Sequence, residues 1–337
     1  MPRKGWRRLG SRGRFRYVDA RGNPINDEEK LERIRALVIP PAWKDVWISA
    51  NATAKLQATG VDAAGRKQYL YHPRFRAQRD QAKFDRLIRF AERLPILRAA
   101  MAEHMDRDTL DRERVSAIAT RLINQAWFRV GTDRYVKQSR TFGITTLRKD
   151  HVTVRGQRIS FHFVTKHRAT VRTTLVDAEL ADAIKELVAL PKGQRLFRYE
   201  WEGGLYRLTG ARLNDYVREY LGPEFTAKDF RTWGGTLIAA IAFAEHGPAE
   251  TQTEAKRTIA AVMRKVGEDL GNTPAVARSS YVSPAVIDQY LDGTTIEDFR
   301  PRHLRVVGAR DIELDREEQA LLSLLRSWRI KQARAAA

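Results

Sequence analysis

Residues 144–175 have the sequence ITTLRKDHVTVRGQRISFHFVTKHRATVRTTL, in which apolar and polar residues alternate. A period of two places every second side chain on the same face, which is the pattern of a strand with one buried face. Gly156 and Gln157 interrupt the alternation with residues typical of a turn. We therefore predict three short antiparallel strands over residues 143–175.

The chain on either side of this segment is predicted to be mostly helical. From Gln81 onward, apolar residues recur at steps of three and four, as in an amphipathic helix. On the same criterion we expect helices over residues 81–104, 111–127, 178–189, 211–221, 233–246, 253–268, 284–291 and 315–334.

The N-terminal part has a different pattern and is predicted to be rich in β structure. Between residues 14 and 72, turn residues separate four short apolar or aromatic runs, at 15–18, 46–49, 56–59 and 68–71. Pro73 and a basic, polar stretch then resemble a linker. We place two domains at residues 1–80 and 81–337. The expected fold class is α+β, with a small β-rich domain and a larger, mainly helical domain that contains the small antiparallel sheet.

The charge of the chain indicates a polyanionic partner. The 337 residues include 61 Lys and Arg against 41 Asp and Glu, a formal net charge of +20 with a pI near 10.4. Residues 1–90 hold 21 basic and 9 acidic side chains, so most of the excess lies at the N-terminal end. Residues 3–16 contain seven Lys or Arg and no acid, and we interpret them as a basic arm.

Several kinds of chemistry are excluded by the residues present. The chain has no cysteine, which rules out disulfides, iron–sulfur clusters and a thiol nucleophile. The segment GVDAAGRKQ, residues 60–68, approaches a phosphate-binding loop, but Gln68 replaces the required hydroxyl and Lys67 comes one position late. No zinc motif is present, and the acidic series at 106–111 lacks the glycine and final glutamate of a calcium loop. We expect no metal, no cofactor and no nucleotide.

The sequence also argues against a membrane protein. The longest useful apolar run, Leu237 to Ala244, is eight residues, against the roughly 20 needed to cross a bilayer. The basic N-terminus lacks the apolar stretch of a secretory signal and the serine-rich composition of a transit peptide. We expect a cytoplasmic protein without a membrane partner.

Four segments place cationic or polar groups where composition alone does not require them. Each taken alone has an ordinary explanation, such as a helix-end ion pair, a turn lysine, an interface cation or a packed ring. It is their order that makes them notable. The segments are AWFRVG at 126–131, FVTKH at 163–167, KDFRTWGGT at 228–236, and the stretch from GNTP at 271–274 to SSYV at 279–282.

Taken together, these segments resemble the type IB DNA topoisomerases of the poxvirus-like and bacterial branch. That family orders its active site as Arg, Lys, Arg, His or Asn, and Tyr; the order here is Arg129, Lys166, Arg231, Asn272 and Tyr281. GRKQYLYH at 65–72 also resembles the family segment that reads the major groove of DNA. The resemblance covers roughly residues 15–295.

The resemblance implies a reaction and a role for each residue. Tyr281 would be the nucleophile that forms a 3′-phosphotyrosyl bond, Arg129 and Arg231 would stabilise charge on the phosphate, and Lys166 would be the general acid. Asn272 stands where poxvirus members have His, and we expect it to be neutral and orienting. The implied activity is relaxation of supercoiled DNA by nicking, rotation and religation, without ATP or metal. No general base for Tyr281 is apparent.

The expected partner is double-stranded DNA, held in a clamp by a monomer associated with the nucleoid. Lys67, Gln68, Tyr69 and Tyr71 are side-chain types that reach base edges in a major groove. In a strand, however, Tyr69 and Tyr71 share one face and Gln68 points to the other.

Two other classes remain open at this point. A tyrosine recombinase has a similar catalytic set, but it usually has His three positions before the second arginine, where this chain has Lys228, and its N-terminal domain is typically helical. An architectural DNA-binding protein would explain the charge but not the tyrosine constellation.

Overall fold

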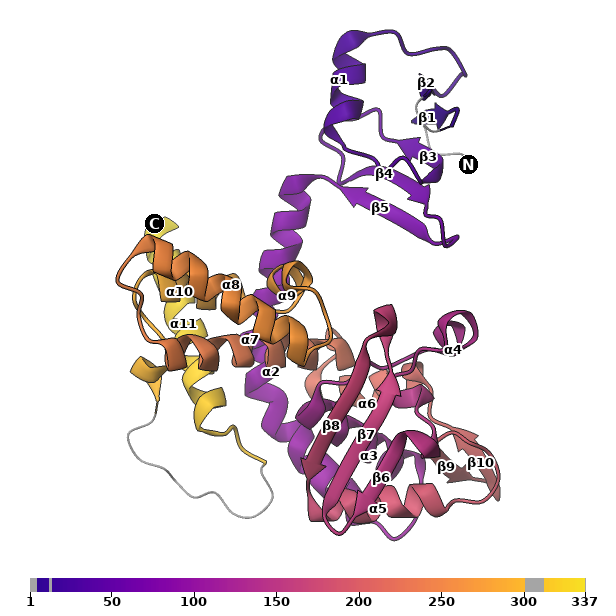
Figure 1. Ribbon diagram of the computed structural model, residues 1–337, viewed down its shortest axis with the longest axis vertical. Coiled ribbons are helices and arrows are strands. Elements are labelled where there is room, and N and C mark those ends of the chain that lie inside the picture. The colour runs from indigo at the N-terminus through magenta and orange to yellow at the C-terminus, as the bar shows by residue number, and fades with distance from the viewer. Residues whose placement is uncertain (1–4, 12–13, 301–311, 337) are drawn as a thin grey trace. The chain divides into compact units, whose positions relative to one another are not determined.

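The computed structural model describes residues 5–11, 14–300 and 312–336 (Figure 1). The chain divides into two compact units, Met1–Lys83 and Phe84–Ala337. The result is a mixed fold, with a small sheet in the N-terminal unit and a mostly helical C-terminal unit.

The N-terminal unit is built on a five-stranded antiparallel sheet with the order β2-β1-β3-β4-β5. Its core is formed by Trp6, Ile34, Val46, Ile48 and Ala58, all buried. Each of the four apolar runs that were expected to form strands overlaps a strand of this sheet. The strands are β1 (Trp6–Leu9), β2 (Arg16–Val18), β3 (Lys44–Ile48), β4 (Leu56–Val61) and β5 (Lys67–Tyr71).

Two features of this unit differ from the sequence prediction. The segment 14–72 contains a helix, α1 (Glu28–Ala36), which begins at the cap of Asp27 and buries Ile34. Part of the expected basic arm is strand β1, in which Arg8 donates to the carbonyl oxygens of Pro40 and Trp43 and therefore belongs to the folded unit. Other members of that arm, Arg3, Lys4 and Arg12, lie outside the described residues.

The C-terminal unit contains the predicted three-stranded antiparallel sheet, β6 (Val152–Arg155), β7 (Arg158–Val164) and β8 (Thr170–Val176). Gly156 makes the β6–β7 turn with a φ of 58°. One face of β7 is buried, and Phe161 and Phe163 on that face pack edge-on against Phe128 at 5.2 and 5.4 Å between ring centroids. This packing fixes the segment that follows α3 (Arg112–Ala126) against the sheet.

Among the described residues from Pro73 onward, the helices include all eight that were expected and two that were not. α2 begins at Pro73, before the expected start, and α7 begins six residues early, at Ala227. The unexpected helices are the short α4 and α9, and a hairpin of β9 (Arg198–Trp201) and β10 (Gly204–Arg207) was also missed. The helices are α2 (Pro73–Met105), α3, α4 (Asp133–Ser139), α5 (Ala178–Ala189), α6 (Gly210–Leu221), α7 (Ala227–His246), α8 (Gln252–Asp269), α9 (Pro274–Ser280), α10 (Pro284–Leu291) and α11 (Arg316–Ala336).

Helix α7 is the central element of the C-terminal core. Thr226 and Asp229 form a capping box at its start, and buried residues follow along most of its length. Gly234 and Gly235 lie in its interior, where glycine costs about 1 kcal/mol relative to alanine. Both positions require glycine because there is no room for a side chain. A Cβ on Gly234 would lie 2.3 Å from Nε1 of Trp127, and one on Gly235 would lie 2.9 Å from the carbonyl oxygen of Tyr281. The two glycines let two separate segments approach α7 closely.

Candidate active site

Arg129 is positioned by the end of helix α3. Trp127 ends the helix in the left-handed conformation, with a φ of 51°, and turns the chain. Beyond it, the amide of Ile144 donates to the carbonyl oxygen of Arg129 at 2.8 Å. Gly131 and Gly143 cross so closely that a Cβ on Gly131 would lie 2.9 Å from the Gly143 Cα. The backbone around Arg129 is therefore fixed on both sides.

The guanidinium of Arg129 points to the loop between α8 and α9. Its Nη2 donates to the carbonyl oxygen of Gly271 at 2.8 Å and to Oδ1 of Asn272 at 2.7 Å. Nδ2 of Asn272 donates to the carbonyl oxygen of Leu270 at 3.2 Å. Both ends of the Asn272 amide are thus bound within the protein, and one of them holds Arg129.

Arg231 lies on the first turns of α7 and is only 4% exposed. It donates from Nη2 to the carbonyl oxygen of Leu270 at 2.7 Å and from Nη1 to that of Trp127. Its Cζ lies over the ring of Tyr281, 5.0 Å from the centroid. The buried guanidinium of Arg231 thus donates hydrogen bonds to the ends of α3 and α8 and contacts the aromatic ring of Tyr281.

Tyr281 is the residue that ends helix α9, and its backbone is anchored on α7. Its amide donates to the carbonyl oxygen of Ala277 at 2.9 Å. The buried hydroxyl of Thr236 contacts the carbonyl oxygen of Tyr281 at 3.1 Å and accepts from the amide of Ser283 at 3.1 Å. These contacts hold the half-buried side chain beside Arg231.

The surrounding cations make the phenol of Tyr281 more acidic. Burial alone would raise its pKa, but the charge and polar contact of Arg231, followed by the charges of Lys228 and Arg129, lower the pKa below its ordinary value of 10.0. Burial, and then the charge of Arg231, lower the pKa of Arg129 to about 10. Cations held this close in a partly dry site are a favourable setting for an anion.

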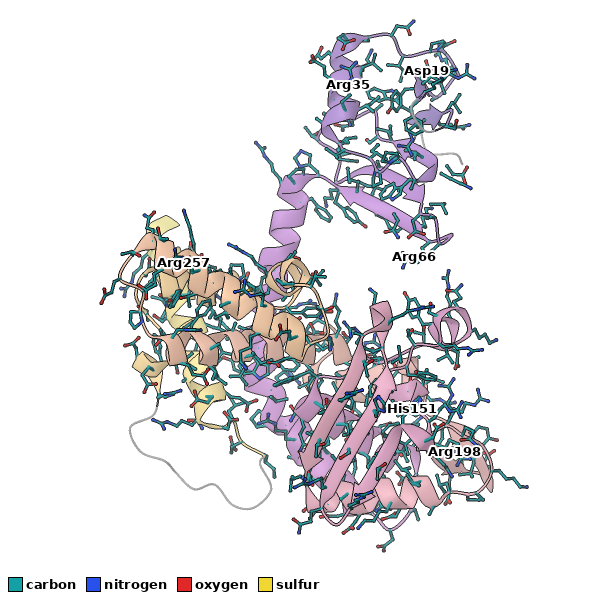
Figure 2. All side chains as sticks on the ribbon, viewed as in Figure 1. Asp19, Arg35, Arg66, His151, Arg198 and Arg257 are labelled. Atoms are coloured by element: carbon teal, nitrogen blue, oxygen red, sulfur yellow. The ribbon has the colours of Figure 1, made fainter. Side chains whose placement is uncertain are left out.

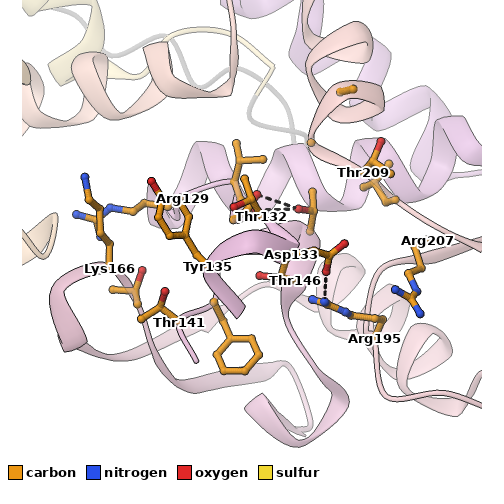
Figure 3. Close-up of a pocket in the computed structure, with 18 of the residues that line it drawn as sticks. Arg129, Thr132, Asp133, Tyr135, Thr141, Thr146, Lys166, Arg195, Arg207 and Thr209 are labelled. Atoms are coloured by element: carbon orange, nitrogen blue, oxygen red, sulfur yellow. Dashed lines mark hydrogen bonds and ion pairs between the residues drawn. The ribbon is translucent and has the colours of Figure 1, made fainter. Parts of the chain in front are cut away.

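Lys166 lies in the turn between β7 and β8 and is exposed. It lines, together with Arg129, a pocket of about 580 Å³ in the C-terminal unit. Figure 3 shows Lys166 and Arg129 at the same end of this pocket. Arg129 and Arg231 line a second pocket, of about 240 Å³. Arg129 therefore links Lys166 to the group around Tyr281.

The structure thus brings four of the five predicted residues together. Arg129 contacts Asn272, and Arg231 contacts Tyr281. The two pairs are connected by the carbonyl oxygen of Leu270, which accepts from both Arg231 and Asn272. Lys166 joins them only by sharing the pocket with Arg129. Among the described residues, no group of His, Asp or Glu side chains is arranged to hold a metal ion.

The predicted DNA-reading residues all lie on β5 of the N-terminal unit. Tyr69 and Tyr71 share an exposed face, with their rings stacked at 6.3 Å, and Nζ of Lys67 lies 5.9 Å from the Tyr69 ring. Gln68 faces the other way and donates to Oδ2 of Asp62 at 2.8 Å. Asp62 also pairs with Arg66, which Figure 2 labels at the β4–β5 turn. The exposed face therefore presents Lys67, Tyr69 and Tyr71 without Gln68.

Sequence reasoning did not assign two residues that the structure places in the site. Lys228 precedes Arg231 by three positions, one turn of a helix, and that spacing would have indicated a second cation near the phenol. Thr236 acts on Tyr281 from 45 positions away, and no pattern in the sequence indicates that contact.

The phenol of Tyr281 thus contacts one guanidinium, is made more acidic by the charge of a second, and lies near a site whose lysine lines the same pocket as that second guanidinium. Such a phenol can act as a nucleophile toward a phosphoester. The class of protein follows from comparison with known families. The catalytic core of eukaryotic DNA topoisomerase I matches residues 72–298, and the N-terminal domain of bacterial DNA topoisomerase IB matches residues 14–62. The chain belongs to the type IB DNA topoisomerase family.

Individual relatives agree with this assignment. The DNA topoisomerase 1B of Acanthamoeba polyphaga mimivirus is 32% identical over 295 residues, covering 85% of this chain and 88% of the viral protein. The DNA topoisomerase I of monkeypox virus and the DNA topoisomerase 1B of vaccinia virus (strain Copenhagen) are each 21% identical over 277 residues, covering 80% of this chain and 85% of the relative. In the described part of the chain, no helix has the length and apolar character needed to cross a membrane.

Proposed function

We propose that this chain relaxes supercoiled double-stranded DNA by cutting one strand, letting it rotate and resealing it. The observation that carries the proposal is the contact between the Tyr281 ring and the buried guanidinium of Arg231, with Arg129 and Asn272 joined to the same loop. Family membership supports it. The family match does not favour a recombinase.

In the proposed reaction, the phenol of Tyr281 first loses its proton to solvent, and the phenolate oxygen then attacks the phosphorus of a backbone phosphodiester. A bond between that oxygen and phosphorus forms, the bond from phosphorus to the 5′-oxygen breaks, and Lys166 gives a proton to the departing oxygen. The result is a 3′-phosphotyrosyl bond and a free 5′-hydroxyl. Religation is the same step in reverse, so the phosphodiester energy is kept and neither ATP nor a metal is used.

The two arginines are proposed to act on the phosphate itself. Negative charge builds up on the non-bridging oxygens in the transition state, and guanidinium groups match phosphate and remain charged. Arg129 and Arg231 are already held by protein carbonyl oxygens, so little reorganisation accompanies the reaction. Asn272 is proposed to orient Arg129 through the 2.7 Å contact.

We further propose that each unit contacts the duplex, so that the monomer acts as a clamp. Tyr69, Tyr71 and Lys67 present aromatic and cationic groups on one exposed face of β5, which suits contact with bases and phosphates. Gln68 is bound to Asp62 and would have to leave that contact to reach the same groove.

The proposed function is tested by incubating the protein with negatively supercoiled plasmid in EDTA without nucleotide. The expected result is a ladder of relaxed topoisomers and, after quenching with detergent, a protein–DNA adduct joined through Tyr281 at a 3′-phosphate. A folded, DNA-binding protein that leaves the plasmid supercoiled would refute the proposal.

Lys228 is expected to help set the pH at which Tyr281 reacts. Its charge lowers the pKa of Tyr281, so Lys228→Gln raises that pKa. The phenolate then forms at higher pH, and the midpoint of the pH–rate curve for cleavage moves upward. Cleavage is slower than in the wild type at neutral pH, and the two rates converge at alkaline pH. Single-turnover cleavage of a duplex oligonucleotide across the range from neutral to alkaline pH measures the shift.

Lys256→Gln is the matched control, because Lys256 is exposed on α8 and does not act on Tyr281. Its profile should overlay that of the wild type. An unchanged midpoint in Lys228→Gln would show that the charge of Lys228 does not reach the phenol.

A further inference from the structure

The pocket that holds Lys166 and Arg129 at one end has a second cationic group at the other. Arg195, in the loop before β9, and Arg207, the last residue of β10, line it there, as Figure 3 shows. The hydroxyl-bearing Thr209, two positions after Arg207, also lines the pocket and caps helix α6. The two cationic ends belong to one pocket of about 580 Å³, which is large enough for more than a single phosphate.

The charges at this second end are not balanced by the protein. Asp133 is the acidic residue that lines the pocket, and it is paired with Arg195. Nη1 of Arg195 is buried and has no hydrogen-bond partner among the described residues. The guanidinium of Arg207 is exposed and, within the described part of the chain, makes no hydrogen bond or ion pair. One carboxylate thus faces two guanidinium groups, one of them unpaired.

Two neighbouring guanidinium groups repel each other unless an anion lies between them. Burial is the main cause that lowers the pKa of Arg195, and the charges of Arg207 and Arg148 act in the same direction, against that of Asp133. The N-terminus of α6, a helix of 12 residues, adds a partial positive charge at Gly210. The geometry and the charges favour an anion with several oxygen acceptors.

We propose that the Arg195–Arg207 end of the pocket binds a second backbone phosphate of the same DNA strand whose neighbouring phosphate meets Arg129 and Lys166. This inference rests on the proposed function. A DNA strand carries a phosphate at every nucleotide, so a strand bound at one cationic end brings further phosphates along the pocket. Guanidinium groups match phosphate oxygens in a forked, two-bond geometry. The second contact would fix the position of the strand relative to Tyr281.

Arg207→Ala tests the subsite through the salt dependence of binding. The affinity for a fluorescent duplex oligonucleotide is measured at several salt concentrations in a Tyr281→Phe background, where no cleavage occurs. Loss of one phosphate contact reduces the slope of log K against log salt by about 0.9 and weakens binding equally for different sequences. Arg207→Lys keeps the charge and should recover most of the slope.

Arg155→Ala is the matched control. Arg155 is exposed at the β6–β7 turn, at the opposite end of β7 from the turn that carries Lys166. The slope of log K against log salt for Arg155→Ala should equal that of the Tyr281→Phe protein without further substitution. Equal slopes for Arg207→Ala and Arg155→Ala would overturn the proposal. Competition by inorganic phosphate at fixed ionic strength that disappears in Arg207→Ala would support it, because the free anion would then displace the DNA phosphate from the Arg195–Arg207 end.

Failure of the proposed function gives a different result. A wild-type protein that does not relax plasmid, with the slope difference still present, would refute relaxation and leave a phosphate contact in a DNA-binding protein. A wild-type protein that relaxes plasmid, with Arg207→Ala indistinguishable from Arg155→Ala, would refute the subsite alone.

Discussion

Tyr281→Phe is expected to abolish relaxation, with a loss of at least about 10⁴-fold in rate, because removal of a nucleophile leaves no covalent route. The substitution removes only the phenol oxygen, so the ring stays under Arg231 and the backbone stays bound to Thr236. Folding and DNA affinity should change little. Plasmid relaxation and the detergent-stable adduct report the loss, and binding of a duplex oligonucleotide reports the retained affinity.

Tyr220→Phe is the matched control for this substitution. Tyr220 lies half-buried on α6, and its ring contacts His104 and Tyr216 rather than the site around Arg231. This variant should relax plasmid at the wild-type rate. Persistence of the adduct in Tyr281→Phe, or loss of activity in both variants, would contradict the assignment of Tyr281 as the nucleophile.

Arg231→Ala is expected to lower the single-turnover cleavage rate by about 10²–10³-fold, the usual effect of losing one donor that stabilises transition-state charge. The variant should also be less stable, because the carbonyl oxygen of Trp127 loses its buried donor, at a cost of about 1–3 kcal/mol, while that of Leu270 keeps the amide of Asn272. The melting temperature and the cleavage rate per folded molecule are measured on the same preparation to separate the two effects.

Arg114→Ala provides a control for the loss of stability alone. Arg114 is also buried, donates to the Met105 carbonyl oxygen and pairs with Glu186 on α5, and it does not contact Tyr281. We expect a lower melting temperature with cleavage per folded molecule close to that of the wild type. If Arg231→Ala behaved in the same way, Arg231 would be a structural residue only.

The five site residues were proposed from the resemblance of their segments to the type IB family, because each segment taken alone has an ordinary explanation. Their contacts were not predictable. The capping box of Thr226 and Asp229 starts α7 before the apolar stretch begins, so periodicity alone placed the helix start too late. Helix α9 was missed because PAVARSS is short and composed largely of small residues, although Thr273 and Pro274 are typical start signals.

Long-range contacts account for the rest of what the sequence did not reveal. The sequence predicts that Asn272 is neutral and orienting, but the structure adds that its amide is bound to Arg129 and to the Leu270 carbonyl oxygen. The grouping of Arg195 with Arg207 depends on the β9–β10 hairpin, which the sequence prediction missed. Local patterns cannot reveal contacts that depend on how separate elements pack.

The hydroxyl of Thr236 has a mechanical consequence. In the proposed reaction, the rotating DNA is tethered to the protein through the side chain of Tyr281, and torque on the DNA pulls on that residue. Thr236 connects the backbone on both sides of Val282 to α7, through the carbonyl oxygen of Tyr281 and the amide of Ser283. In that reaction, part of the load on the tether would pass into α7, a helix whose residues from Phe230 to Ala240 are buried.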